Sequence, residues 1–403
     1  MMQQYQYNPE HFSRSAPTKY HPEDLKSQEM LINIGPQHPS THGVLRLEVV
    51  TDGEVVVDVV PHLGYLHRCF EKHAEALPYP QIIPYVDRMD YLAAMNGEHV
   101  YALGVEQMLG IEEKISPRVK YSRVLVAELN RIASHFVSLG TYALDIGSFT
   151  PFLWVMRDRE HILRLLEWTC GARMLYNYIW IGGLYYDLPL GFEERCAEFV
   201  NYLRPKLEEL EQIVVDNKIF VKRTANIGVL PINLAVNYGI TGPMLRASGL
   251  PFDLRKEEGY SVYPELDFDI PVGSGAVGTL GDCWDRVYVR VRECYESLRI
   301  IEQCVEALQK KYPRTREFNP REAVPKKVKP KKGDFYFRGE TPKGELGFFF
   351  QTTGKQDIPL RVKVRAPSFC NLSVLSEISR GAMLADLVAI VGSVDIVLGE
   401  VDR

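Results

Sequence analysis

Apolar residues recur at steps of three and four along the middle of the chain, from about residue 78 to residue 216. The pattern is clearest in residues 122–147, 158–180 and 191–216, and it returns in residues 281–312. This spacing is typical of amphipathic helices that bury one face. Long helices of this kind, joined by short connections, predict a helix bundle.

Alternation of apolar and polar residues replaces the helical pattern near the N-terminus. Residues 44–65 alternate on both sides of Asp52-Gly53, a dipeptide typical of the tight turn in a β-hairpin. Short β-prone runs return in residues 344–354 and 360–369, and a helical pattern follows over residues 373–392. We therefore expect an α+β fold: a long-helix bundle core, an N-terminal β-hairpin subdomain and a small C-terminal α/β part.

These patterns divide the chain into five segments. They are an extended N-terminal arm (1–30), an N-terminal β subdomain (31–75), a helical bundle (76–318), a Lys/Pro-rich loop (319–334) and a C-terminal α/β segment (335–403). No apolar run reaches the 18 or more residues that a membrane-spanning helix needs. We expect any contact with a membrane to be made through other subunits.

Charge and cysteine spacing exclude several kinds of partner. The formal net charge is −5, so no bulk electrostatic attraction favours nucleic acid or an anionic membrane surface. The seven cysteines include no CxxC pair, which is the usual spacing for zinc or iron–sulfur ligands. We expect this chain to bind no metal and to keep its thiols reduced, as in a cytosolic compartment.

Three polar residues stand in unusual surroundings. His38 lies in GPQHPSTHG, where two prolines restrict the backbone, Tyr91 lies among apolar residues, and Asp145 lies between leucine and isoleucine. An imidazole, a phenol and a carboxylate in such places can hold or donate protons. Each also has a structural alternative, as a turn cap, a core tyrosine or a helix cap. The residue pattern alone leaves both alternatives open.

Eight stretches, in order along the chain, resemble one protein family. They are GPQHPSTHGVLRLEV, GYLHRCFEK, PYVDRMDYLAAM, LGTYALDIGSFTPF, GARM, GPMLRASGLPFDLRK, RAPSF and DIVLGEVDR. Together they resemble the D subunit of NADH:quinone oxidoreductase, respiratory complex I. The resemblance runs from about residue 30 to residue 403. The same family is related to the large subunit of nickel–iron hydrogenases.

The hydrogenase relatives hold their metal through two pairs of cysteine thiolates, and this chain lacks all four. The matching positions are Asp90 and Ala93 in RMDYLA, and Val397 and Glu400 in DIVLGE. A metal that prefers sulfur therefore has no ligands here. Residues 340–344, ETPKG, resemble a Glu-Ala-Pro-Arg-Gly loop of the hydrogenases. The resemblance implies that the vacated pocket receives a quinone headgroup, with the C-terminal segment closing the site.

Three residues receive catalytic roles from the resemblance. His38 and Tyr91 would hydrogen-bond the two carbonyl oxygens of the quinone, and Asp145 would pair with His38 and orient it. This arrangement suits the reaction, because a quinone that becomes a hydroquinone gains two electrons and two protons, so proton donors must reach both oxygens.

The resemblance also implies the surroundings of the site. Asp395 and Val397 would line the far side of the pocket. Arg68 and Arg88 would lie near the terminal 4Fe-4S cluster, which belongs to the neighbouring B subunit. Further partners would be the C subunit and the H subunit of the membrane arm, on the cytoplasmic side of the inner membrane. The chain would be the quinone-binding core subunit of a proton-pumping NADH:quinone oxidoreductase, with no cofactor of its own.

The chain departs from the family pattern at three positions. Cys69 stands where many relatives have glycine, Leu175 replaces a histidine and Trp180 replaces an arginine. The resemblance therefore carries over neither a titrating group at position 175 nor a cation at position 180. We expect Cys69 to be a small buried residue, with a redox-sensitive thiol as the alternative.

Two other classes of protein remain as alternatives to the quinone-binding subunit. One is the large subunit of a membrane-bound nickel–iron hydrogenase-like complex, which the missing thiolates disfavour. The other is a structural scaffold without chemistry. A related photosynthetic complex takes its electrons from ferredoxin, so the sequence leaves the electron donor open.

Overall fold

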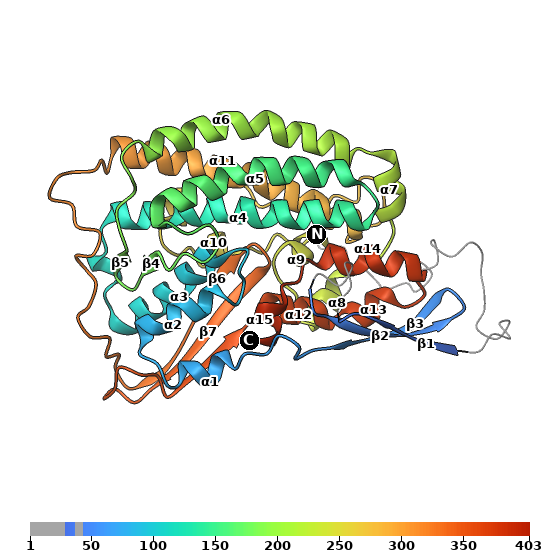
Figure 1. Ribbon diagram of the computed structural model, residues 1–403, viewed down its shortest axis with the longest axis horizontal. Helices are drawn as coiled ribbons and strands as arrows, with labels where there is room; N and C mark the ends of the chain where they lie inside the picture. The colour runs from blue at the N-terminus through green and yellow to red at the C-terminus, as the bar shows by residue number, and fades with distance from the viewer. Residues whose placement is uncertain (1–28, 37–42) are drawn as a thin grey trace.

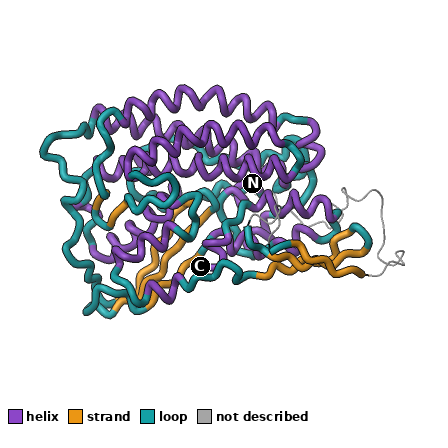
Figure 2. The backbone as a smooth tube through the Cα atoms, in the orientation of Figure 1, coloured by secondary structure: helices purple, strands orange, loops and turns teal. Residues whose placement is uncertain are grey.

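The computed structural model describes residues 29–36 and 43–403. Long helices form one layer, a three-stranded sheet lies beneath them, and a second three-stranded sheet extends to one side (Figure 1). Figure 2 shows both sheets on the side of the long helices that faces away from α6 (Phe192–Leu210). The expected α+β class is confirmed. His38 and most of the predicted N-terminal arm lie outside the described residues.

Four long helices of the described chain form the bundle and run side by side in Figure 1. They are α4 (Pro117–Asp145), α5 (Phe149–Cys170), α6 and α11 (Cys283–Lys310). Their facing sides bury apolar side chains such as Leu129, Leu166 and Leu298. Each such leucine contributes roughly 1.5–3 kcal/mol relative to an exposed one. The apolar positions that recur at steps of three and four in the sequence are therefore those that face the neighbouring helices.

The helix predicted over residues 158–180 is wrong in its second half. α5 ends at Cys170, because Gly171 follows with φ 80°, the left-handed conformation typical of a helix C-terminus. Residues further on form the short strand β4 (Ile179–Trp180), which pairs with β5 (Gly183–Leu184). Gly171 was the stop signal that the apolar spacing obscured.

The predicted N-terminal hairpin is confirmed. β2 (Arg46–Asp52) and β3 (Val55–His62) are antiparallel and turn at Gly53, which has φ 61°. A strand that the pattern did not predict, β1 (Glu29–Ile34), pairs antiparallel with β2 and completes the order β1-β2-β3. Alternate residues of β2 are buried, as the alternation in the sequence requires.

The C-terminal sheet consists of β6 (Gly333–Thr341), β7 (Gly344–Thr352) and β8 (Arg361–Arg365), in that order. It packs on α3 (Ala94–Leu109), where the Tyr101 ring lies 5.4 Å from that of Phe348, centroid to centroid. Only two residues connect β6 to β7, and the second is Lys343. This tight turn carries the lysine side chain into the interior, where it is fully buried.

The remaining helices are short. They are α1 (Phe70–Ala74), α2 (Tyr79–Asp87), η4 (Glu112–Lys114), η5 (Glu211–Val215), α7 (Lys218–Thr224), α8 (Ile232–Asn237), α9 (Pro243–Ala247), α10 (Leu254–Glu257), η6 (Tyr263–Glu265), α12 (Pro367–Ser373), α13 (Leu375–Ser379), α14 (Leu384–Val394) and α15 (Leu398–Asp402). The helix predicted over residues 373–392 is divided into α13 and α14 at Gly381, which has φ 77°. Across the described ranges, no helix has the length and apolar character needed to cross a membrane.

Candidate functional site

A buried lysine, Lys343, lies at the centre of the candidate site. Its ammonium nitrogen is 3.3 Å from Asp90 Oδ2 and 4.0 Å from Asp395 Oδ2, and it donates to Ser134 Oγ of α4 at 2.9 Å. Burial would lower the pKa of Lys343, but the charges on Asp395 and Asp90 raise it above its usual value. Lys343 is therefore held as a cation inside the protein.

Tyr91 lies beside this lysine in the irregular segment between α2 and α3. Asn130 of α4 holds the segment: its amide donates to Leu92 O at 3.0 Å and its Oδ1 accepts from Met95 N at 3.0 Å. Tyr91 is half-buried. Burial, helped by the charge on Asp90, raises the pKa of the Tyr91 phenol. The hydroxyl is thus protonated at neutral pH and can donate a hydrogen bond.

The far side of the site is the turn between α14 and α15. Asp395 caps α14 with φ 59°, and its Oδ2 is 3.8 Å from Arg290 Nε. Ser368 joins the next two residues of interest: its Oγ accepts from Val397 N at 3.2 Å, and its N donates to Glu400 Oε1 at 2.9 Å. Asp395, Val397 and Glu400 are all buried. The structure therefore brings Asp395 and Asp90 to one lysine, beside Tyr91.

Arg68 and Arg88 lie together on the surface next to this segment. Arg68 Nη2 donates to Arg88 O at 2.6 Å, and Arg88 Nη1 donates to Pro84 O at 2.7 Å. Both side chains are exposed. Gly399 of α15 packs on the same backbone, since a Cβ there would lie 2.4 Å from Met89 O. Two exposed cations thus mark the outer side of the site.

Asp145 belongs to the described residues, but its predicted partner, His38, does not. Asp145 is the last residue of α4, half-buried, and eleven residues beyond Ser134, which is about 16 Å along the helix axis. His38 lies outside the described residues, so the pairing of His38 with Asp145 stays a prediction. Gly43, which follows that loop, lies at α15: a Cβ on it would be 3.4 Å from Leu398 Cδ1.

The expectation that Cys69 is buried is wrong. Its side chain is exposed, and its backbone has φ 56°, a left-handed conformation that glycine adopts more easily. The Cys69 sulfur lies 3.6 Å from Nε2 of His67.

Trp180, at the position where the resemblance implies an arginine, is accompanied by a cation from elsewhere in the chain. The guanidinium carbon of Arg321 lies 5.0 Å from the centroid of the Trp180 ring and 4.8 Å from that of Tyr185. Such cation–π contacts hold a positive charge over the aromatic faces. A positive charge is therefore present at this place although residue 180 carries none.

Two buried carboxyl groups, Asp87 and Glu98, hydrogen-bond each other behind the Tyr91 segment. Asp87 Oδ2 also accepts from Asn177 N at 3.0 Å, while Glu98 Oε2 accepts from Tyr178 N and Ile179 N at 2.9 and 2.6 Å. Burial raises the pKa of both carboxyls, and their proximity adds to the effect on Glu98. The pair thus holds a proton and anchors the chain after α5.

Glu98→Gln is expected to weaken the pH dependence of stability. The native pair binds a proton that the unfolded chain releases near pH 4.5, so its contribution is complete below that pH and is lost as the pH rises through the raised native pKa. An amide keeps a donor for Asp87 at every pH. Thermal unfolding of the assembled complex between pH 5 and pH 8 measures this. Glu113→Gln, at an exposed site, is the control, and an unchanged slope for Glu98→Gln contradicts the shared proton.

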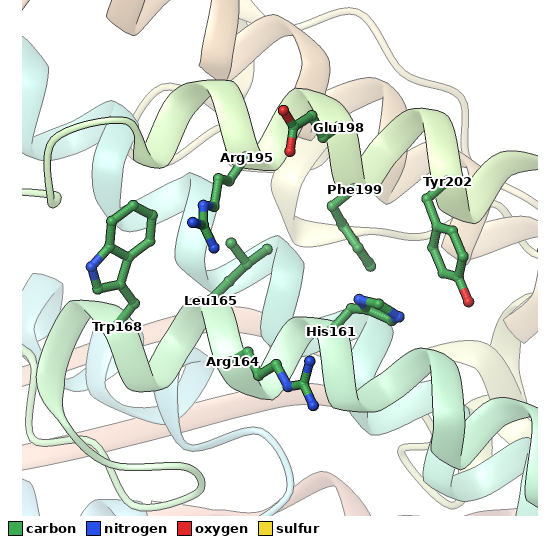
Figure 3. A pocket seen from close by; sticks show the side chains of 8 residues that line it. All are labelled: His161, Arg164, Leu165, Trp168, Arg195, Glu198, Phe199 and Tyr202. Atoms are coloured by element: carbon green, nitrogen blue, oxygen red, sulfur yellow. The ribbon is translucent and has the colours of Figure 1, made fainter.

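A separate cavity of about 530 Å³ opens between α5 and α6 (Figure 3). It is lined by His161, Arg164, Leu165, Trp168, Arg195, Glu198, Phe199 and Tyr202. Arg195 lies over the Trp168 ring at 5.0 Å, and the rings of His161 and Tyr202 are 4.6 Å apart. None of the predicted site residues lines this cavity, so the candidate chemistry lies with Lys343 and Tyr91.

The donor atoms at the site are oxygens and one ammonium nitrogen. Within residues 29–36 and 43–403, no group of three or more His, Cys, Asp or Glu side chains is arranged to hold a metal ion. A cation next to a protonated phenol can instead orient a carbonyl oxygen and give it a proton.

Comparison with known proteins places the chain in a family. A family model described as the 49 kDa subunit of respiratory-chain NADH dehydrogenase matches residues 145–403. The D 1 subunit of NADH-quinone oxidoreductase from Cytophaga hutchinsonii is 73% identical over 380 residues, which are 94% of this chain and 97% of the relative. The D subunit from Amoebophilus asiaticus is 65% identical over 398 residues, 99% of each chain. The D subunit from Chlorobium phaeovibrioides is 59% identical over 94% of each.

These matches agree with the resemblance that the sequence motifs carry. They cover nearly the whole chain, and sequence identities of 65–73% leave no doubt about membership of the family. The chain therefore belongs to the family of the 49 kDa, or D, subunits of NADH–quinone oxidoreductase, respiratory complex I, and it works as part of that multisubunit enzyme.

Proposed function

We propose that this chain forms the quinone-reducing site of its complex. Tyr91 would donate a hydrogen bond and then a proton to one carbonyl oxygen of the headgroup. His38, oriented by Asp145, would serve the other oxygen. The observation that carries the proposal is the half-buried, protonated phenol of Tyr91 beside Lys343, which is held as a cation by Asp90 and Asp395.

The pocket around the headgroup would have a polar side and an apolar side. Asp395 and Val397 lie on the turn that faces Lys343, and Val397 is only 2% exposed. An apolar wall against the quinone ring and a few convergent polar groups are typical of small-molecule sites. The C-terminal segment 335–403, which supplies both residues and Lys343, would close the site.

Electrons would arrive from the 4Fe-4S cluster of the B subunit, docked against Arg68 and Arg88. Two exposed guanidinium groups suit a surface that approaches an anionic cluster held by thiolates. The chain would also contact the C subunit and the H subunit of the membrane arm. It would lie peripherally on the cytoplasmic side of the inner membrane, and quinone reduction would be coupled to proton pumping.

A hydrogenase-like metal centre receives no support from the donor chemistry. The four positions that carry thiolates in the hydrogenases are Asp90, Ala93, Val397 and Glu400. Two of them carry no ligand atom in the side chain, and the two carboxylates are hard oxygen donors that suit nickel and iron less well than sulfur does.

A photoreactive short-chain quinone is expected to label residues 85–95 of this chain in the assembled complex. The phenol and the buried cation would hold the headgroup against this segment, so peptide mass spectrometry should find the label there. Excess unlabelled quinone should suppress it. The cavity between α5 and α6 serves as the control for adventitious labelling. Label found only at that cavity, or label that excess quinone leaves unchanged, contradicts the proposed site.

A further inference from the structure

Five ionisable side chains meet in the interior behind Tyr91. They are Asp90, Arg290, Lys343, Asp395 and Glu400, and their side chains are at most 7% exposed. Lys343 links Asp90 to Asp395, and Arg290 lies 3.8 Å from Asp395. Glu400 belongs to the same cluster: the preceding residue, Gly399, packs on Met89 O beside Asp90, the charge on Asp90 acts on Glu400, and the charge on Glu400 acts on Lys343.

The charges of this cluster do not balance when all five groups are ionised. Two cations face three carboxylates, which leaves one excess negative charge in a site shielded from water. An uncompensated charge in the interior is far costlier than a neutral carboxyl, so one of the three acids keeps its proton. The remaining question is which of the three acids this is.

The contacts single out Glu400. Asp395 has Arg290 and Lys343 within 4.0 Å, and Asp90 has Lys343 at 3.3 Å. Glu400 has no ion pair of this length with any cation of the described chain, and its Oε1 accepts a hydrogen bond from Ser368 N. Burial, reinforced by the charge on Asp90, raises the pKa of Glu400 to about 7. Burial raises the pKa of Asp90 as well, but the charge on Lys343 opposes that shift.

The other charged groups around the cluster have partners of their own. Arg68 donates to the Arg88 carbonyl. Glu293 is bound by Arg246 and by His135. Arg286 lies beside Asp282 and Asp285. On the other side, Arg403 pairs with Glu71, and Asp402 accepts from Gly64 N and Leu66 N. Among the described residues, none of these groups forms an ion pair with Glu400.

We propose that Glu400 holds the exchangeable proton of this cluster and serves as the internal proton reserve of the quinone site. The inference rests on the proposed function. Two electrons from the partner's iron–sulfur cluster and two protons convert the quinone to hydroquinone. On the Tyr91 side, the phenol O–H bond breaks and a hydroquinone O–H bond forms. The Glu400 O–H bond then breaks, the phenol O–H bond is restored, and the carboxylate of Glu400 later takes a proton from solvent.

Two features favour this direction of transfer. The pKa of the Tyr91 phenol is raised by burial above its usual value, so a phenolate takes a proton from a carboxyl readily. The charge on Lys343 acts on both Tyr91 and Glu400, and it stabilises the carboxylate that the transfer leaves behind. Protonated Glu400 thus returns the site to its starting state before water has to enter.

Glu400→Gln tests the kinetic part of the inference in the assembled complex. The amide keeps the shape and the neutral charge of the protonated acid but has no proton to give. We expect kcat for quinone reduction to fall about tenfold with KM little changed. This is less than the roughly 100-fold or more that a direct general acid contributes, because Glu400 acts through Tyr91. We also expect the parent enzyme to lose activity as the pH rises through about 7, the pKa of Glu400, and Glu400→Gln to lack this loss. Parental kcat at every pH would overturn the inference.

Infrared spectroscopy tests the charge count without turnover. Glu400→Gln should remove one protonated-carboxyl band. Asp90→Asn leaves two cations and two carboxylates, so Glu400 should ionise and the same band should vanish at neutral pH although Glu400 is present. Glu113→Gln, at an exposed position, should leave the band intact. A band that survives in Glu400→Gln contradicts the assignment to Glu400, and a band that survives in Asp90→Asn contradicts the charge count.

The two proposals fail in different ways. When the photoreactive quinone labels residues 85–95 but Glu400→Gln keeps the parental pH profile, the proton reserve is wrong and the quinone site stands. When the label is found only elsewhere, the quinone site is wrong and the reserve role falls with it, whatever the infrared band shows.

Discussion

Arg246→Met is expected to destabilise the protein by about 3–5 kcal/mol, the cost typical of removing one partner from a buried ion pair. Arg246 is fully buried. It donates to Glu293, to Glu340 Oε1 at 2.7 Å and to Phe252 O at 3.0 Å. The substitution would leave both carboxylates in the interior without their cation. It would also separate β6, which carries Glu340, from α11, which carries Glu293.

The rest of the buried network explains why repair is difficult. Burial would raise the pKa of Glu293, but Arg246 and the hydrogen bond with His135 hold it well below its usual range. Glu128 is bound by both Arg131 and Arg255, so these cations are not free to replace Arg246. The charge lost at position 246 therefore has no substitute nearby.

The yield and thermal unfolding of the assembled complex measure the effect of Arg246→Met. Arg204→Met is a matched control, because it removes an ion pair of 2.6 Å with Glu302 in which both side chains are more than 40% exposed. Exposed pairs contribute only about 0–1 kcal/mol. Equal stability of the two variants would contradict the importance assigned to the buried network.

Tyr91→Phe is expected to lower quinone reductase activity about 100-fold, the lower range for loss of a general acid. The substitution removes a single hydroxyl, and the half-buried ring keeps its packing. Assembly of the complex and the spectroscopic signal of the terminal cluster should therefore be retained. The reason for the loss is chemical: one carbonyl oxygen of the quinone would have no phenol to donate to it.

Steady-state kinetics with a short-chain quinone measure this effect, since a short chain reports on the headgroup rather than on the tail. Tyr85→Phe is the matched control, because Tyr85 is on α2, only six residues away, and is 38% exposed. Full activity of Tyr91→Phe would contradict a hydrogen bond from Tyr91 to the quinone headgroup. An equal loss of activity in both variants would indicate that any tyrosine substitution in this segment disturbs the enzyme.

Local signals in the sequence predict much of the fold. The turn at Asp52-Gly53 and the helical periodicity of residues 122–147 and 281–312 both agree with the structure, because each element carries its own pattern. Strand β6 was missed: it begins at Gly333, just after a Lys- and Pro-rich stretch, and its pairing with β7 decides its conformation. Long-range pairing of this kind leaves little trace in a window of local sequence.

The site residues, too, could be predicted where a local motif marks them and were missed where only the fold decides their surroundings. The motif around Tyr91 and the turn with Asp395 could be recognised, and the structure brings Asp90 and Asp395 to one lysine. Lys343 itself was not predicted as a site residue, because a lysine in a turn is normally exposed. Its place in ETPKG, where the hydrogenases carry an arginine, was the available signal. Cys69 was misjudged because its exposure depends on a backbone angle that only the fold determines.

The tight turn between β6 and β7 has a consequence for biosynthesis. Lys343 follows Asp90 by some 250 residues, and Glu400 follows it by about 310. At roughly 5–20 residues per second, a ribosome needs some tens of seconds to pass from Asp90 to Lys343. Until Lys343 has been synthesised, Asp90 lacks the cation that it faces in the folded protein. The centre of the site is thus completed last, and slow codons before residue 343 would lengthen the interval in which a nascent chain exposes it.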